Sequence, residues 1–182
     1  MRWTDSTFRR LDERDGRRVH AFDCGERMQN AFLREAALRD RRGSISVTHL
    51  LERTEGIVAY LTLCADSVSL APGERPRAVR WSVLPAVKVA QMAVDLRFQR
   101  MGVGESMLYA AARIAASVDR SVGVRFLTVE ALDERLVRWY EGHGFVRNLR
   151  AQEIRREEAV RRGRDPDAIA IGLRLDLRDG GT

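Results

Sequence analysis

A short segment with two glycines carries the clearest chemical signal in this chain. Residues 99–104 read Gln-Arg-Met-Gly-Val-Gly, between an apolar strand pattern that ends near Asp95 and a helix pattern that begins at Val103. Glycine permits a backbone turn with positive φ and leaves no Cβ between the backbone and a ligand. The unpaired N–H groups of a helix's first turn, together with the helix dipole, attract an anion such as a pyrophosphate. The segment therefore predicts a phosphate-binding loop.

Other kinds of glycine loop fit this segment less well. A dinucleotide-binding loop has a third glycine where this chain has Met107. A nucleoside-triphosphate-binding loop ends in Gly-Lys-Ser/Thr, which does not follow here. An ordinary strand-to-helix turn is the alternative, because glycines interrupt many such turns.

A tyrosine in a second predicted helix is a candidate general acid. Asp133 can cap this helix, Leu132 can pack on Val137, and the helix closes at residues 141–144. The phenol of Tyr140, with an ordinary pKa of about 10, is protonated at neutral pH and can give up its proton. The alternative is a core aromatic whose hydroxyl finds a partner.

Composition and charge narrow the class of protein. The 182 residues predict one domain, and a net charge of +6 with a pI near 10.3 favours polyanionic partners, with a charged solvated surface as the alternative. Cys24 and Cys64 have no metal-ligand spacing, which predicts no metal site and a reducing compartment. The longest apolar run, 57–65, is too short to span a bilayer, and the N-terminus lacks a signal-peptide core, so we expect a cytoplasmic protein without membrane contact.

Strand and helix patterns alternate around the glycine loop, which is typical of an α/β or α+β domain. Asp23 and Glu26 form a predicted capping box, and the helix that follows should bury Met28 and end at Gly43. From Asp66 to Leu84 neither a strand nor a helix pattern is present, which predicts a long loop. Other strands are expected at 7–11, 45–51, 57–64, 87–95, 124–131 and 169–177, and other helices at 103–118, 133–141 and 150–164.

Two groups of basic residues are candidates for binding a polyanionic substrate. Arg39, Arg41 and Arg42 end the first predicted helix, where they could also simply complement its dipole. Arg77, Arg80 and Trp81 lie in the long loop, where the indole could stack on a base or anchor its loop to the core.

The glycine loop and Tyr140 together resemble the GNAT superfamily of N-acetyltransferases. Residues 99–104 match the Q/R-x-x-G-x-G/A loop that holds the pyrophosphate of acetyl-CoA in that family, and Tyr140 precedes the family's x-x-x-G-F at Gly144 and Phe145. The resemblance implies a mixed, mostly antiparallel sheet of about six or seven strands, flanked by helices and splayed at the acetyl-CoA site. It also implies a single GNAT domain over residues 1–182. The charged helix predicted at 150–164 departs from the resemblance, as an insertion before the last strand.

One branch of the family is particularly similar. The segments 22–25, 41–43 and 84–95 resemble the bacterial GNAT toxins of toxin–antitoxin pairs. That likeness implies acetylation of the α-amino group of aminoacyl-tRNA, a block of translation, a homodimer and a ribbon-helix-helix antitoxin. The alternatives are a GNAT enzyme for a small-molecule or protein amine, and a catalytically silent GNAT-like binding module.

The resemblance assigns roles to single residues. It makes Tyr140 the acid that protonates the leaving coenzyme A thiolate, and Glu130 is a candidate base at the end of its strand. A base is scarcely needed for an α-amine, because its pKa of about 7.7–8.0 leaves it partly neutral at pH 7. The residues that would contact acetyl-CoA are Met92, Ala93, Val94, Gln99, Arg100, Met101, Gly102, Val103, Gly104 and Glu105.

Overall fold

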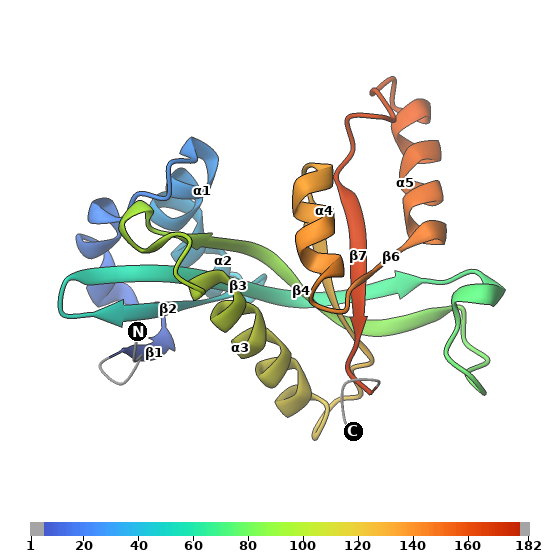
Figure 1. The fold of residues 1–182 in the computed structure, drawn as a ribbon, viewed down its shortest axis with the longest axis horizontal. Helices are drawn as coiled ribbons and strands as arrows, with labels where there is room; N and C mark the ends of the chain where they lie inside the picture. The colour runs from blue at the N-terminus through green and yellow to red at the C-terminus, as the bar shows by residue number, and fades with distance from the viewer. Residues whose placement is uncertain (1–5, 179–182) are drawn as a thin grey trace. The chain divides into compact units, whose positions relative to one another are not determined.

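Seven strands form one mixed sheet in the order β1-β2-β3-β4-β5-β7-β6 in the computed structural model, which describes residues 6–178 (Figure 1). The expected mixed, mostly antiparallel sheet flanked by helices is confirmed. The strands are β1 (Thr7–Arg10), β2 (Val47–Arg53), β3 (Gly56–Ser69), β4 (Val83–Val94), β5 (Phe126–Ala131), β6 (Val146–Arg147) and β7 (Ile171–Asp176). The helices are α1 (Arg27–Ala31), α2 (Ala37–Arg42), α3 (Val103–Val118), α4 (Glu134–Glu141) and α5 (Leu149–Arg161).

The parallel ladder between β4 and β5 is short. It pairs Ala86, Val87 and Lys88 with Phe126, Leu127 and Thr128. Beyond Lys88, β4 continues to Val94 without a partner in β5 among the described residues. The backbone of β4 after Lys88 is therefore free of a ladder on its β5 side.

The chain forms two compact units. One comprises residues up to 64 together with 89–113. Its core contains Phe22 and Tyr60, whose rings pack edge to face with their centroids 5.4 Å apart. The Tyr60 hydroxyl donates a hydrogen bond to Gln29 Oε1 at 2.6 Å. The π-helical segment Phe32–Ala36 joins α1 to α2, and Figure 1 shows both helices in this N-terminal part, where α2 contacts β2.

The other unit comprises residues 65–88 and those from 114 onward. It is built on the antiparallel ladder of β5 with β7, which runs from Phe126 opposite Asp176 to Ala131 opposite Ile171. Both α4 and α5 contact β7 and lie alongside it in Figure 1. No helix within residues 6–178 is long and apolar enough to cross a membrane.

The predicted capping box at Asp23 is wrong. α1 begins at Arg27, with Glu26 as an N-cap whose side chain makes no capping bond. The Asp23 carboxylate instead accepts hydrogen bonds from Gly25 N at 2.8 Å and Asn30 Nδ2 at 2.7 Å. It closes a turn ahead of the helix, and Met28, expected in the core, is 87% exposed.

The predicted strand at 45–51 forms as β2, and the buried face of β2 carries polar side chains as well as apolar ones. Thr48, Leu50 and Glu52 are buried, while Ile45 is exposed. The Thr48 and Thr62 hydroxyls lie 2.8 Å apart and satisfy each other, which is why polar side chains occupy this inner face.

The long loop predicted from Asp66 to Leu84 is shorter than expected. β3 continues to Ser69, because Asp66 accepts a hydrogen bond from Thr128 Oγ1 at 2.6 Å and Val68 is buried. β4 begins at Val83, so the loop spans residues 70–82 and contains the 3₁₀-helix Pro72–Glu74.

Candidate phosphate loop and candidate proton donor

The predicted phosphate-binding loop has the backbone that its sequence requires. After β4, the 3₁₀-helix Leu96–Phe98 leads into Arg100 and Gly102, whose φ angles of 61° and 78° lie in the left-handed region. A Cβ built on Gly102 would meet nothing within 4 Å. The surface above Gly102 is therefore open to a ligand.

The start of α3 supplies the donors for an anion. The first bond of this 16-residue helix runs from Ser106 N to Gly102 O at 3.1 Å. The N–H groups of residues 103–105 precede it and have no partner within the helix. They stand at the positive end of the helix dipole, where a phosphate group is stabilised.

The side chain of Gln99 hydrogen-bonds the backbone next to the loop. Its Nε2 donates to Cys24 O at 2.9 Å and to Val94 O at 3.0 Å. The Gln99 amide thus holds the loop in place, and the exposed residues Arg100, Met101 and Glu105 are the loop side chains that face solvent.

Asp95 fixes the other end of the loop. It is buried and accepts hydrogen bonds from Arg97 Nε at 2.8 Å and from the backbone N of Asp23 at 3.3 Å. Burial raises the pKa of Asp95, but the hydrogen bonds from Arg97 more than offset this and hold that pKa below its usual range. The charge of Arg97 is therefore engaged by Asp95, whereas Arg100 makes no ion pair among the described residues.

The last three residues of β4 before the loop are Met92, Ala93 and Val94. They lie beyond Lys88, where the pairing with β5 has ended. Ala93 is buried, and Met92 and Val94 are half-buried. Their backbone can pair with an extended ligand as a strand would.

Tyr140 lies on the buried face of α4. As predicted, Asp133 caps this helix, because its Oδ1 accepts a hydrogen bond from Leu136 N at 2.8 Å. The predicted packing of Leu132 on Val137 is wrong, because Leu132 is 80% exposed. The Tyr140 ring contacts Phe145 at 5.4 Å and is only 7% exposed.

The Tyr140 hydroxyl is suited to donating a proton. Burial raises the pKa of Tyr140 to about 12, so the phenol is fully protonated at neutral pH. No residue in 6–178 hydrogen-bonds this hydroxyl, and its oxygen is not among the fully buried unpartnered atoms of that range. It therefore keeps some contact with solvent, and its proton is not committed to a neighbour.

Glu130 is held by two cations. Its Oε1 lies 2.7 Å from Lys88 Nζ and 2.9 Å from Arg155 Nη2. An amine would reach this oxygen only by displacing one of them.

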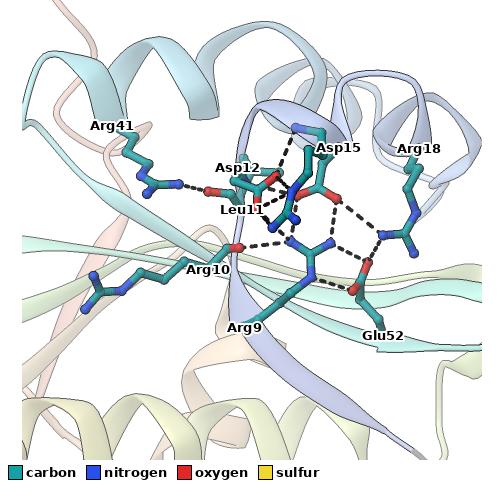
Figure 2. Close-up of polar contacts among 9 residues, drawn as sticks. Arg9, Arg10, Leu11, Asp12, Asp15, Arg18, Arg41 and Glu52 are labelled. Atoms are coloured by element: carbon teal, nitrogen blue, oxygen red, sulfur yellow. Dashed lines mark hydrogen bonds and ion pairs between the residues drawn. The ribbon is translucent and has the colours of Figure 1, made fainter.

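The arginines that end α2 differ in their surroundings. Arg41 donates to Leu11 O (Figure 2), and Arg42 pairs with Glu13 at 2.6 Å on the surface. Arg39 is exposed and lies 3.8 Å from Asp40. All three arginines are exposed and thus accessible to a polyanion, although one nitrogen of Arg41 is committed to Leu11 O.

The other basic group lies in the loop 70–82. Arg77 and Arg80 are exposed and make no ion pair with any residue in 6–178, and Trp81 is 75% exposed rather than anchored in the core. Glu74, the one acidic residue of this loop, is nearly buried and was not predicted as a site residue. The signal was a single carboxylate in an otherwise basic segment, directly after Pro72 and Gly73. Among the described residues, no cluster of His, Cys, Asp or Glu side chains could hold a metal ion.

Comparisons with known proteins converge on one family. The family model for acetyltransferases (GNAT) matches residues 7–145. A tRNA-acetylating toxin of Mycobacterium tuberculosis is 27% identical over 135 residues, which cover 72% of this chain and 79% of the toxin.

Solved structures agree with this result. AtaT complexed with acetyl-methionyl-tRNAfMet is 27% identical, with a TM-score of 0.71 over 78% of this chain and 87% of that one. A mutant AtaT toxin bound to the C-terminus of the antitoxin AtaR is 25% identical, with a TM-score of 0.71 over 96% and 95% of the two chains.

Proposed function

The chain belongs to the GNAT acetyltransferase family, and we propose that it acetylates the α-amino group of aminoacyl-tRNA and thereby blocks translation as a toxin. As a member of the family it is an N-acetyltransferase that uses acetyl-CoA. The observation that carries the proposal is the glycine loop at the start of α3, in a chain whose relatives include a tRNA-acetylating toxin.

Acetyl-CoA fits the residues that are present. The N–H groups of residues 103–105 and the open surface above Gly102 would receive its pyrophosphate. The backbone of Met92, Ala93 and Val94 would pair with the pantetheine arm and polarise the thioester carbonyl. Acetyl-CoA supplies an activated acetyl group and a thiolate leaving group.

Tyr140 would act as the general acid. Its Oη holds a proton that burial retains, since its pKa is about 12, and passes that proton to the departing sulfur. Glu130 is the candidate base, although its Oε1 is paired with Lys88 and Arg155. An α-amine that is partly neutral at pH 7 reduces the need for this base.

Exposed basic residues in each of the two units support a tRNA acceptor. Arg39, Arg42, Arg77 and Arg80 are exposed, and Trp81 offers a ring for stacking. The structure of AtaT with acetyl-methionyl-tRNAfMet supports the same class of acceptor.

The relatives also suggest the partners. AtaT has been solved with the antitoxin AtaR, and we propose that this chain likewise has an antitoxin, of the ribbon-helix-helix type, and acts as a homodimer in the cytoplasm.

A second candidate acceptor is a small-molecule or protein amine. The hydrogen bond from Arg41 to Leu11 O favours it, because one nitrogen of an arginine assigned to tRNA is committed to the protein backbone. A catalytically silent role is disfavoured by the intact loop and the protonated Tyr140.

The test is transfer of labelled acetyl from acetyl-CoA to a pool of aminoacyl-tRNA, with uncharged tRNA and free amino acids as controls. Label that appears only on charged tRNA, and leaves with the amino acid on mild base treatment, is the expected result. Enzyme that binds acetyl-CoA but labels only free amines would move the acceptor to the second candidate.

A further inference from the structure

The loop 70–82 is fastened to α5 through Glu74. Its Oε1 accepts a hydrogen bond from Leu149 N at 2.9 Å, and its Oε2 accepts one from Arg150 N at 3.0 Å. These are N–H groups of the first turn of α5, which have no partner within the helix. A carboxylate about 75 residues away in sequence therefore caps α5, a helix whose own N-cap residue, Asn148, makes no capping bond.

Arg174 completes this anchor from β7. Its Nη1 lies 3.0 Å from Glu74 Oε1 and also donates to Asn148 Oδ1 and to Arg147 O, each at 2.9 Å. Both charged side chains are 9% exposed. A buried pair with further hydrogen bonds on each partner specifies one geometry, because breaking it leaves an uncompensated charge.

The rest of the loop has the opposite character. Residues 75–82 contain three arginines and no acidic residue. A turn closed by Val79 N to Pro76 O at 3.1 Å holds Ala78 at a φ of 66°, a left-handed conformation that costs a non-glycine residue about 1 kcal/mol or more. The turn presents Arg77, and the indole of Trp81 is 75% exposed.

We propose that residues 75–82 form a binding element for single-stranded RNA, and that Glu74 and Arg174 are the positioning residues that hold it in its binding conformation. Trp81 stacks on an unpaired base, and Arg77 and Arg80 contact the flanking phosphates. The proposal rests on the proposed function in taking RNA as the polyanion.

The chemistry of the segment favours this ligand. An exposed indole beside unpaired guanidinium groups suits unstacked bases on a phosphate backbone, whereas bases within a duplex offer no free face. Holding the element in place before binding lowers the entropy lost on association.

The first experiment measures binding without catalysis. Intact protein is titrated into a short unstructured RNA that carries a fluorophore, and the anisotropy of the RNA gives the affinity for wild type and variants, with a duplex RNA of the same length as a competitor. The tryptophan emission of the wild-type protein is recorded in parallel. We expect the RNA to quench the emission, the duplex to compete poorly, and Trp81→Ala to weaken binding on the order of tenfold or more. Unchanged affinity in Trp81→Ala, or equal binding of the duplex, would overturn the proposal.

The second experiment tests the positioning role. Glu74→Gln removes the charge that faces Arg174, and its matched control, Glu153→Gln, removes a carboxylate that pairs with Arg150 on the exposed side of α5. If the variant loop is competent in about a tenth of the molecules, the apparent Kd for RNA rises about tenfold. KM for the RNA acceptor should rise with it while kcat changes little, and Glu74→Asp should recover part of the loss.

Controls separate misfolding from loss of the element. Acetyl-CoA binding and the thermal midpoint are measured for each variant, and a Glu74→Gln protein with normal values for both but full RNA affinity would overturn the positioning role. Wild-type protein that shows the quench but acetylates no aminoacyl-tRNA would refute the proposed acceptor alone. Wild-type protein that acetylates aminoacyl-tRNA without any quench would refute the binding element alone.

Discussion

Gln99 Nε2 donates to the carbonyl oxygen of Cys24 at 2.9 Å, and this bond ties the glycine loop to the segment ahead of α1. The same nitrogen also donates to Val94 O. The conspicuous polar side chain of the motif is therefore committed to the protein itself. Phosphate binding is left to the backbone N–H groups of residues 103–105, which makes the conformation of Gly102 decisive.

Gly102→Ala should weaken acetyl-CoA binding at a modest cost in stability. The new Cβ meets no atom within 4 Å, but φ is 78°, so the variant loses roughly 1–2 kcal/mol or shifts the loop. Calorimetric titration with acetyl-CoA and thermal denaturation measure the two effects. Gly123→Ala is the control, because its Cβ is equally unobstructed and its φ is not left-handed; an equal effect there would contradict the argument.

Tyr140→Phe should lower kcat by about a hundredfold or more while leaving the Kd for acetyl-CoA nearly unchanged. Because the pKa of Tyr140 is about 12, the acid form persists at alkaline pH, and the wild-type rate should not decline up to about pH 10. A pH–rate profile of both proteins checks this. Tyr109→Phe, on the exposed side of α3, serves as the control, and near-normal turnover of Tyr140→Phe would remove Tyr140 from the mechanism.

Asp95 should make the protein acid-sensitive. Its pKa is lower in the folded chain than the ordinary value of about 3.9, so its stabilising effect is complete above that value and is lost as the pH falls through the folded pKa. The difference in free energy of unfolding between wild type and Asp95→Asn should therefore be constant near neutrality and shrink below about pH 4. Denaturant melts at several pH values give this difference. A difference that does not vary with pH would refute the assignment, and Asp40→Asn is the comparison variant.

Arg9 should matter far more to stability than its neighbour Arg14. Figure 2 shows Arg9 between Asp15 and Glu52, at 2.5 Å and 2.7 Å, and both carboxylates are nearly buried. Arg9→Met leaves Arg18 as the one cation paired with them within residues 6–178, which should cost about 2–3 kcal/mol, somewhat less than a fully orphaned buried pair. Arg14→Met, which breaks a surface pair with Asp12, should leave the urea midpoint unchanged.

The role of Arg42 in tRNA binding can be tested by removing its ion-pair partner Glu13. If Arg42 contacts a phosphate, Arg42→Ala should reduce the salt slope of tRNA binding by about one, and Glu13→Ala should strengthen tRNA binding. Arg41→Ala should instead lower the thermal midpoint, because Arg41 donates to Leu11 O. Unchanged tRNA binding in both Arg42→Ala and Glu13→Ala would exclude this end of α2 from the acceptor surface.

Local signals in the sequence predicted the elements that depend on local physics. The glycine loop, the start of α3 and the Asp133 cap each depend on neighbours within a few residues. The family resemblance supplied the sheet, which the strand order confirms.

Two local predictions, the capping box at Asp23 and the packing of Leu132 on Val137, were nevertheless wrong. The other errors arose where distant residues decide the outcome. Thr48 is buried because Thr62 lies opposite it, and Asp66 continues β3 because Thr128 donates to it. Glu74 meets Arg174 across 100 positions of the chain. Side-chain pairings of this kind produce no periodic pattern in the sequence, so hydropathy patterns could not predict them.

The place of β7 in the sheet has a consequence for biosynthesis. β7 lies between β5 and β6 but follows both in the chain, so these two strands leave the ribosome before the strand that joins them exists. Helix α4, which carries Tyr140, also packs against β7 and so waits for that strand. The nascent chain thus assembles the surroundings of Tyr140 only after every other strand has been made, and this unit stays immature until then.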